Sequence, residues 1–187
     1  MTVTEAHQKT FVNGRVRVIV GDITREQVDV IVNAANSSLL GGGGVDGAIH
    51  RAGGPTILEE CRELRRTLYP QGLPTGAAVI TTAGAMPVQY VIHTVGPMYG
   101  KHKGRESELL TACYRNSLML AAKHSLRSIA FPAISTGVYR YPRAEAAAVA
   151  SQAVQEFFAG DESLQEVRMV FFQPADARVF IMNQKFG

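Results

Sequence analysis

Hydrophobic residues along this chain follow two different spacings, which alternate from its beginning to its end. Apolar runs rich in Val and Ile predict β-strands, and these runs cover residues 15–20, 28–32, 77–82, 90–95, 128–132 and 167–172. Stretches in which apolar residues recur every three or four positions predict helices, which cover residues 55–68, 107–124 and 142–159. Asp176 is expected to cap a short closing helix.

The order of these elements predicts the fold class. Strands that alternate with helices form a layered α/β sandwich around a mostly parallel sheet. The chain contains no linker, repeat or low-complexity segment, so residues 1–187 are expected to form a single domain, with residues 1–10 as a flexible N-terminus. In such sheets ligands bind beyond the carboxyl ends of the strands. We therefore look for a functional site in the loops that follow the strands.

Composition is that of an ordinary globular protein and favours one cellular compartment. Of the 187 residues, 46% are hydrophobic and 19% are charged. Cys61 and Cys113 are too few for a disulfide framework or a zinc site, which favours a reducing, cytoplasmic compartment. The N-terminus lacks the apolar core of a signal peptide, and no stretch reaches the roughly 18 apolar residues of a membrane span. No association with a membrane is expected.

The charge of the chain says little about its partners. The formal charge is +3 and the pI is about 9.0, which is only mildly basic. A cluster of arginines without an interleaved aromatic residue is typical of a solvated helix face rather than a nucleic-acid surface; it consists of Arg62, Arg65 and Arg66. Nucleic acid is not an expected partner on this ground.

The first unusual loop is Gly21–Thr24, directly after the strand predicted at residues 15–20. Gly and Asp both favour turns, so a simple turn is one interpretation. The other is functional, because Asp22 at a strand end can accept hydrogen bonds from an exocyclic amine such as that of adenine. The residues of this loop leave both interpretations open.

The second loop contains four consecutive glycines, Gly41–Gly44, before a helix. Glycines let backbone N–H groups turn inward and approach a ligand closely, and the positive end of the following helix attracts phosphate. The loop is not a Walker A sequence, since no Gly-Lys-Ser/Thr follows, and it lacks the acidic residue that accompanies a dinucleotide fingerprint. It predicts a phosphate-binding loop of another type.

Asp46 and His50 lie four residues apart and share one face of the helix after this loop. Asp46 alone could be an N-terminal helix cap, and His50 alone could be a core histidine bonded to a backbone carbonyl. Beside a glycine loop and the polar Asn36, the two together indicate a site.

A third loop joins the strand at residues 128–132 to a helix and runs through Ser135, Thr136 and Gly137. These residues expose several N–H groups at a helix N-terminus and form a second phosphate-binding nest. Two such loops predict a diphosphate held between them, as in a nucleoside diphosphate sugar. Tyr139 could cover the sugar or simply pack, and Phe172 could stack on a base or belong to the core.

Together these segments resemble a known family, the macrodomains, and specifically the ADP-ribosyl hydrolases of the MacroD type. The resemblance runs in order over most of the chain, from about residue 15 to residue 180, and rests on Gly21–Thr24, Asn33–Asn36, Gly41–Asp46 with His50, Ile92–Pro97 and Ile134–Tyr139. It implies a three-layer α/β/α sandwich with a mixed, mostly parallel sheet that binds ADP-ribose in a surface cleft.

The resemblance also assigns parts of the ligand to residues. Asp22 and the backbone of Ile23 would take the adenine amine, and Phe172 would stack on the ring. The diphosphate would lie between two loops, formed by Gly43, Gly44 and Val45 on one side and by Ser135, Thr136, Gly137, Val138 and Tyr139 on the other. Asn36 would hold the distal ribose, which carries the scissile bond.

The activity implied is hydrolysis of the ester that joins ADP-ribose to a protein Asp or Glu, and of O-acetyl-ADP-ribose. Water must be placed beside the ester and deprotonated as it attacks. Asp46 is expected to orient or activate this water, and His50 to orient Asp46 or the ribose, with no metal and no cofactor. One residue departs from the family pattern: Arg140 stands where glycine is usual after Val138 and Tyr139, and it could reach a phosphate or point to solvent.

Other functions remain open at this stage. A non-catalytic reader of ADP-ribose shares the fold and the phosphate loops, but has no chemical need for Asn36, Asp46 and His50. A phosphatase would need clustered carboxylates for a metal or a nucleophilic cysteine or histidine. The expected partners are ADP-ribose, ADP-ribosylated proteins and O-acetyl-ADP-ribose, with ADP-ribosylated nucleic-acid ends as an exception to the exclusion above, and the protein is expected to be a monomer.

Overall fold

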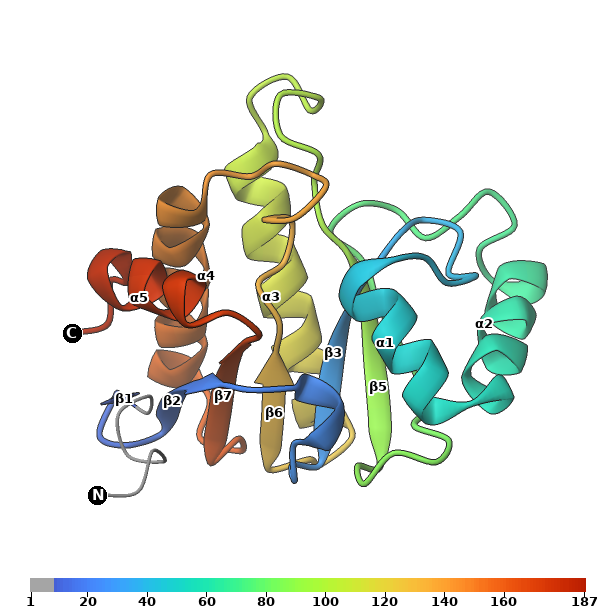
Figure 1. The fold of residues 1–187 in the computed structure, drawn as a ribbon, viewed down its shortest axis with the longest axis horizontal. Coiled ribbons are helices and arrows are strands. Elements are labelled where there is room, and N and C mark those ends of the chain that lie inside the picture. Colours follow the sequence, from blue (N-terminus) through green and yellow to red (C-terminus); the bar gives the residue numbers. More distant parts are fainter. Residues whose placement is uncertain (1–8) are drawn as a thin grey trace.

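The computed structural model describes residues 9–187, which form one seven-stranded sheet (Figure 1). The strands are β1 (Lys9–Phe11), β2 (Val16–Val20), β3 (Val30–Ala35), β4 (Ala78–Thr82), β5 (Tyr90–Val95), β6 (Ser128–Phe131) and β7 (Glu166–Phe171). Their order across the sheet is β1-β2-β7-β6-β3-β5-β4. The five inner strands are parallel, while β1 and β4 run antiparallel at the two edges.

Helices cover both faces of the sheet and make three layers (Figure 1). The helices are η1 (Ile23–Arg25), α1 (Gly44–Gly53), α2 (Pro55–Thr67), α3 (Glu106–Lys123), α4 (Arg143–Gly160) and α5 (Pro174–Asn183). Helices α1 and α2 pack on one face and α3, α4 and α5 on the other. The expected α/β/α sandwich with a mixed, mostly parallel sheet is confirmed.

Strand β3 shows why the sheet needs helices on both sides. Successive side chains of a strand point to opposite faces. Val30 and Val32 enter the core under α3 and α4, while Ile31 and Ala35 enter the core under α1 and α2. A strand that is apolar on both faces is stable only between two covering layers.

Most strands and helices end within one residue of the positions predicted from the pattern, but β3 does not. The prediction placed this strand at residues 28–32. In the structure β3 continues to Ala35, and Asn33 pairs with His93 of β5 in the ladder. The amide nitrogen of Asn33 has hydrogen-bonding partners in this buried strand, whereas its amide oxygen has none among the described residues.

The expectation for Asp176 was wrong. Helix α5 begins at Pro174, with Gln173 as its N-cap, and Asp176 lies in the first turn. Proline suits the first helical position because its fixed φ is already helical and its missing N–H has no partner there. The Asp176 carboxylate instead pairs with Arg143 at the start of α4, 3.1 Å away.

Of the N-terminal segment expected to be flexible, residues 1–8 lie outside the described part of the chain. Lys9 and Thr10 belong to β1 and pair with Val18 and Arg17 of β2, so these two residues correct that expectation. Among the described residues, no helix is both long enough and apolar enough to cross a membrane.

Candidate functional site

The loops singled out in the sequence follow the carboxyl ends of parallel strands, so they meet at one edge of the sheet. Figure 1 shows the loops after β3, β5 and β6 leaving the sheet at the same end of the molecule. Asp22 follows β2, the glycine loop follows β3, and Phe172 follows β7. The site described below is the surface formed by these loops.

The glycine loop brings Asn36 and Asp46 together. A methyl group added at Gly42 would lie 3.1 Å from Asp46 Oδ2 and 3.2 Å from Asn36 Nδ2. At Gly43 and Gly44 the added group would meet no described atom within 4 Å. At Gly42 the backbone therefore packs against these two side chains. At Gly43 and Gly44, where α1 begins, it is open to the outside.

Asp46 is not the cap of α1, because the N-cap is Gly43 and no side chain bonds to this helix end. Its side chain is buried, and its Oδ1 accepts a hydrogen bond of 2.7 Å from Asn33 Nδ2. His50 Nε2 lies 3.4 Å from the same oxygen, as expected for residues four apart on one helix face. Within residues 9–187 this nitrogen makes no hydrogen bond, so the alternative of a histidine satisfied at Nε2 by a backbone carbonyl is not supported. Asp46 Oδ2 is left facing Gly42 and Asn36.

Asn36 shapes the loop that it belongs to. Its Oδ1 accepts from the backbone N–H and the hydroxyl of Ser38, and its Nδ2 donates to the Gly41 carbonyl at 3.0 Å. One amide hydrogen remains for another acceptor. The loop is fastened further by Arg65, which donates to the carbonyls of Ser38, Tyr69 and Pro70.

The arginine cluster is thus only partly a solvated face. Arg62 and Arg66 are exposed, and Arg66 pairs with Glu63 one turn away. Arg65 is half-buried and holds backbone carbonyls. The sequence pattern missed this role because it depends on where the loop after β3 packs.

Asn33 and His93 lie beneath the site and were not singled out in the sequence, although both lie inside the segments that carry the family resemblance. They are buried neighbours on β3 and β5, and Asn33 Nδ2 lies 3.1 Å from His93 Nδ1. Burial, and after it the charge of His50, lowers the pKa of His93 to about 3. Asn33 in an otherwise apolar strand, and a histidine in the apolar pattern of the other, were the signals that could have found them.

The loop after β6 has an unusual backbone. Ser135 is buried and adopts a φ of 66°, which is in the left-handed region. It packs on Gly96, where an added methyl group would overlap Ser135 Oγ. The loop is closed by bonds from Tyr141 N to Ser135 O and from Tyr99 N to Tyr139 O, both 2.9 Å.

The tip of this loop is exposed to solvent. Val138 is 92% exposed, and a methyl group at Gly137 would meet no described atom within 4 Å. Burial, and after it the negative charge of Asp46, raises the pKa of the Tyr139 hydroxyl. The charge of Asp46 acts on Tyr139 although Asp46 stands on α1 and Tyr139 in the loop after β6. Arg140 is exposed.

At the other end of the site, Asp22 forms the turn that was one of its two interpretations. Its Oδ1 caps η1 by accepting from the backbone N–H of Thr24 at 2.9 Å and from the Thr24 hydroxyl at 2.7 Å. Ile23 is buried beneath it. Phe172 is 76% exposed and lies just beyond β7, so it is not a core residue.

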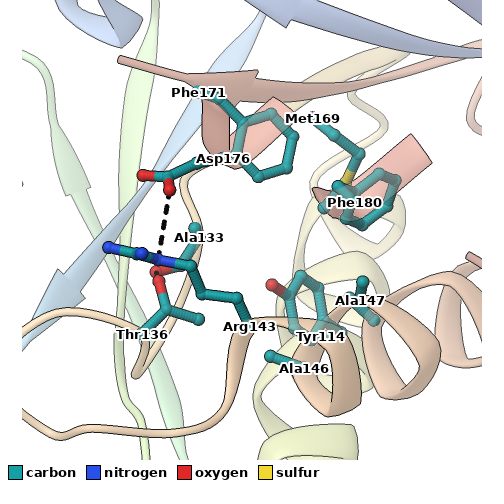
Figure 2. Close-up of a pocket in the computed structure, with 11 residues that line it drawn as sticks. Tyr114, Ala133, Thr136, Arg143, Ala146, Ala147, Met169, Phe171, Asp176 and Phe180 are labelled. Carbon is teal, nitrogen blue, oxygen red and sulfur yellow. Dashed lines mark hydrogen bonds and ion pairs between the residues drawn. The ribbon is translucent and has the colours of Figure 1, made fainter. Parts of the chain in front are cut away.

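A cavity lies behind the loop after β6 rather than between the loops (Figure 2). It is bounded by Ala133 and Thr136 of that loop, by α4 and by α5, and the Arg143–Asp176 ion pair lies at its edge. Its volume of about 20 Å³ has room for roughly one water molecule. It is too small for a nucleotide.

The two thiols lie in the cores on the two faces of the sheet, and Cys61 Sγ lies 3.9 Å from His93 Nε2. Cys61 and Cys113 are buried and free. Burial raises the pKa of Cys61 to about 12 and that of Cys113 to about 11, with the charges of Asp46 and Glu60 adding to the effect at Cys61. Such thiols are poor nucleophiles. In the described part of the chain, no group of three or more His, Cys, Asp and Glu residues is placed to hold a metal ion.

Comparison with known proteins gives the family. A family model described as "Macro domain" matches residues 32–150. An O-acetyl-ADP-ribose deacetylase of Escherichia coli (strain K12) is 52% identical over 167 residues, which are 89% of this chain and 93% of that protein. This chain belongs to the Macro domain family.

Solved structures agree with the assignment. The Oceanobacillus iheyensis macrodomain with ADP has a TM-score of 0.89 and 45% identity, over 94% of this chain and 93% of that chain. The Trypanosoma brucei macrodomain in complex with ADP-ribose has a TM-score of 0.81 and 39% identity, over 89% of this chain and 68% of that chain. The resemblance noted in the sequence is confirmed at the level of the family and the fold.

Proposed function

We propose that this protein binds ADP-ribose across the loops at the carboxyl edge of its sheet. Asp22 and Ile23 would take the adenine, with Phe172 on the ring face. The diphosphate would lie between Gly43–Val45 and Ser135–Tyr139. Three observations support this: the open backbone at Gly43, Gly44 and Gly137, the exposed aromatic ring of Phe172, and the nucleotides named for two solved relatives.

We further propose that the protein is an ester hydrolase, which deacetylates O-acetyl-ADP-ribose and removes mono-ADP-ribose from Asp and Glu side chains of proteins. The observation that carries this proposal is Asp46, a buried carboxylate whose Oδ1 is held by Asn33 while Oδ2 faces Gly42 beside Asn36. A carboxylate held in this way can bind a water beside the distal ribose and accept its proton as it attacks the ester. His50, 3.4 Å from Oδ1, would keep the carboxylate in place.

The balance of the reaction needs only water. The attacking water loses one proton, the ester C–O bond breaks, and the alcohol oxygen takes up a proton as ADP-ribose leaves. The acid product is acetate or the freed side chain of Asp or Glu. No residue has to become covalently attached to the substrate, which fits the burial of both thiols. A relative that is 52% identical is named for the deacetylase reaction.

The first test is release of ADP-ribose from a protein mono-ADP-ribosylated on Glu, and of acetate from O-acetyl-ADP-ribose. We expect Asp46→Ala to lower both rates by at least a hundredfold, because the attacking water loses its base, with ADP-ribose affinity kept within about tenfold. EDTA is expected to leave the wild-type rates unchanged.

Each other outcome has a definite meaning. An active Asp46→Ala enzyme would remove Asp46 from the mechanism. Inhibition by EDTA that a divalent ion reverses would require a metal-dependent reaction. Binding of ADP-ribose without release from either substrate would make the protein a reader rather than a hydrolase.

A further inference from the structure

Asp46 stands at the end of a chain of buried hydrogen bonds that begins at the far edge of the sheet. The chain starts at Thr81 on the edge strand β4, passes through His93 on β5 and Asn33 on β3, and reaches Asp46 on α1. The three heavy-atom distances are 2.9, 3.1 and 2.7 Å in that order. All four side chains are buried. None of the ligand contacts proposed above involves Thr81 or His93.

The chemistry of the groups gives this chain one direction. A carboxylate oxygen can only accept, so the atom of Asn33 that meets Asp46 Oδ1 is the amide nitrogen. The same nitrogen has a second hydrogen, which points to His93 Nδ1. This ring nitrogen must therefore be unprotonated and accept.

The other ring nitrogen then carries the proton of the neutral imidazole. His93 Nε2 donates to Thr81 Oγ1 at 2.9 Å, and the Thr81 hydroxyl donates to the carbonyl of Thr82 at 2.9 Å. The Sγ atom of Cys61 lies 3.9 Å from the same nitrogen and is a second, weaker acceptor. Burial keeps the ring neutral, as the lowered pKa of His93 indicates. If the Asn33 amide were turned over, its oxygen would face the Asp46 carboxylate at 2.7 Å and repel it.

We propose that Thr81 and His93 are positioning residues that act through Asn33 to fix the orientation of the Asp46 carboxylate. The Thr81 hydroxyl donates to the Thr82 carbonyl and is left to accept from His93 Nε2. His93 Nδ1 then accepts from the Asn33 amide, which holds Asp46 Oδ1. With Oδ1 held, Oδ2 stays directed toward Gly42 and Asn36, where the attacking water would lie. The effect on rate rests on the proposed hydrolase function; the direction of the hydrogen bonds does not.

The kinetic test uses Thr81→Val, which removes the hydroxyl and keeps the shape. Without its acceptor, His93 loses the preference for a proton on Nε2, and Asp46 is no longer held in one orientation. We expect kcat for O-acetyl-ADP-ribose to fall about ten- to a hundredfold, as misplacement of a reacting group does, with KM unchanged. Thr81→Ser, which restores the hydroxyl, is expected to recover most of the rate.

Thr94→Val is the matched control for a loss of stability. Thr94 lies on β5 next to His93, is equally buried, and donates its hydroxyl to the Ala77 carbonyl at 2.8 Å. Its side chain points to the opposite face of the sheet, so it does not lead to Asp46. An equal fall of kcat in Thr94→Val and Thr81→Val would overturn the proposal.

A spectroscopic test decides the geometry even if the protein hydrolyses neither ester. Proton–nitrogen correlation spectra of the histidine side chains are expected to show His93 protonated at Nε2 and not at Nδ1. The side-chain amide signals of Asn33 are expected to shift in Thr81→Val and to stay in place in Thr94→Val. A proton on Nδ1 would overturn the proposal, and so would Asn33 side-chain amide signals that do not shift in Thr81→Val.

Discussion

At the scale of single residues, Asp22 combines two tasks in one carboxylate. Its Oδ1 is occupied by the backbone and hydroxyl of Thr24, which fixes the short helix η1. Among the described residues, its second oxygen makes no hydrogen bond. The turn and the ligand role are therefore compatible, because the turn uses one oxygen and leaves the other for the adenine amine.

This division of labour predicts different results for two substitutions at Asp22. Asp22→Asn keeps an oxygen for the cap, so the melting temperature should stay close to that of the wild type, while the preference for ADP-ribose over its inosine analogue should fall. Asp22→Ala should lose that preference and also about 1 kcal/mol of stability, as helix caps do. Calorimetric titration with both ligands and thermal unfolding measure these effects. Unchanged discrimination in Asp22→Asn would refute the adenine contact.

At the scale of elements, the loop after β6 depends on the strand next to it. Gly96 follows β5 and touches the loop at Ser135 and Ile134. Ser135 needs this support because its left-handed φ is unfavourable for a residue with a side chain. The shape of the proposed diphosphate loop is thus set partly by a glycine almost forty positions earlier in the chain.

A methyl group at Gly96 should therefore damage binding without touching the ligand. Gly96→Ala would push against Ser135 Oγ and the Ile134 side chain and shift the loop. We expect ADP-ribose affinity to fall at least about tenfold. Gly160→Ala is the control, since a methyl group there meets no described atom within 4 Å at the end of α4. Calorimetric titration of both variants compares them, and equal affinities would show that Gly96 does not support the loop.

At the scale of the whole molecule, the site introduces buried polar groups into the core of the sheet. Three buried polar side chains lie among the apolar ones between the sheet and the helices α1 and α2, namely Asn33, Thr81 and His93. His93 is buried as a neutral ring with its pKa lowered to about 3, against 6.5 for the free side chain. Such a group makes stability depend on pH.

The sign follows from proton binding in the two states. Between about pH 6.5 and pH 3 the unfolded chain binds a proton at His93 and the folded protein does not. The contribution of the neutral His93 ring to the free energy of unfolding is complete above pH 6.5. It is lost as the pH falls, at up to roughly 1.4 kcal/mol per pH unit. Urea unfolding at pH 6.5, 5.5 and 4.5 is expected to show a shallower decline in His93→Asn than in the wild type. Parallel curves would contradict the assignment to His93.

Some properties of this protein follow from the sequence by itself because they are local. Hydrophobic spacing determined most strands and helices, since strand and helix periods are fixed by backbone geometry. The separation of four residues likewise predicted that Asp46 and His50 share one helix face, and the structure has them there. The glycine loop was also visible in the sequence, because a run of glycines between a strand and a helix favours a backbone that a ligand can approach closely.

Contacts between residues far apart in the chain were decided only by the tertiary structure. Asn33 and His93 are 60 positions apart, and they meet because β3 and β5 are neighbours in one register. The continuation of β3 past Asn33, the hold of Arg65 on the loop after β3, and the pairing of Asp176 with Arg143 have the same origin. A polar residue in a sequence shows that a partner is needed, and the partner is chosen by the packing of strands and helices that local periodicity does not encode.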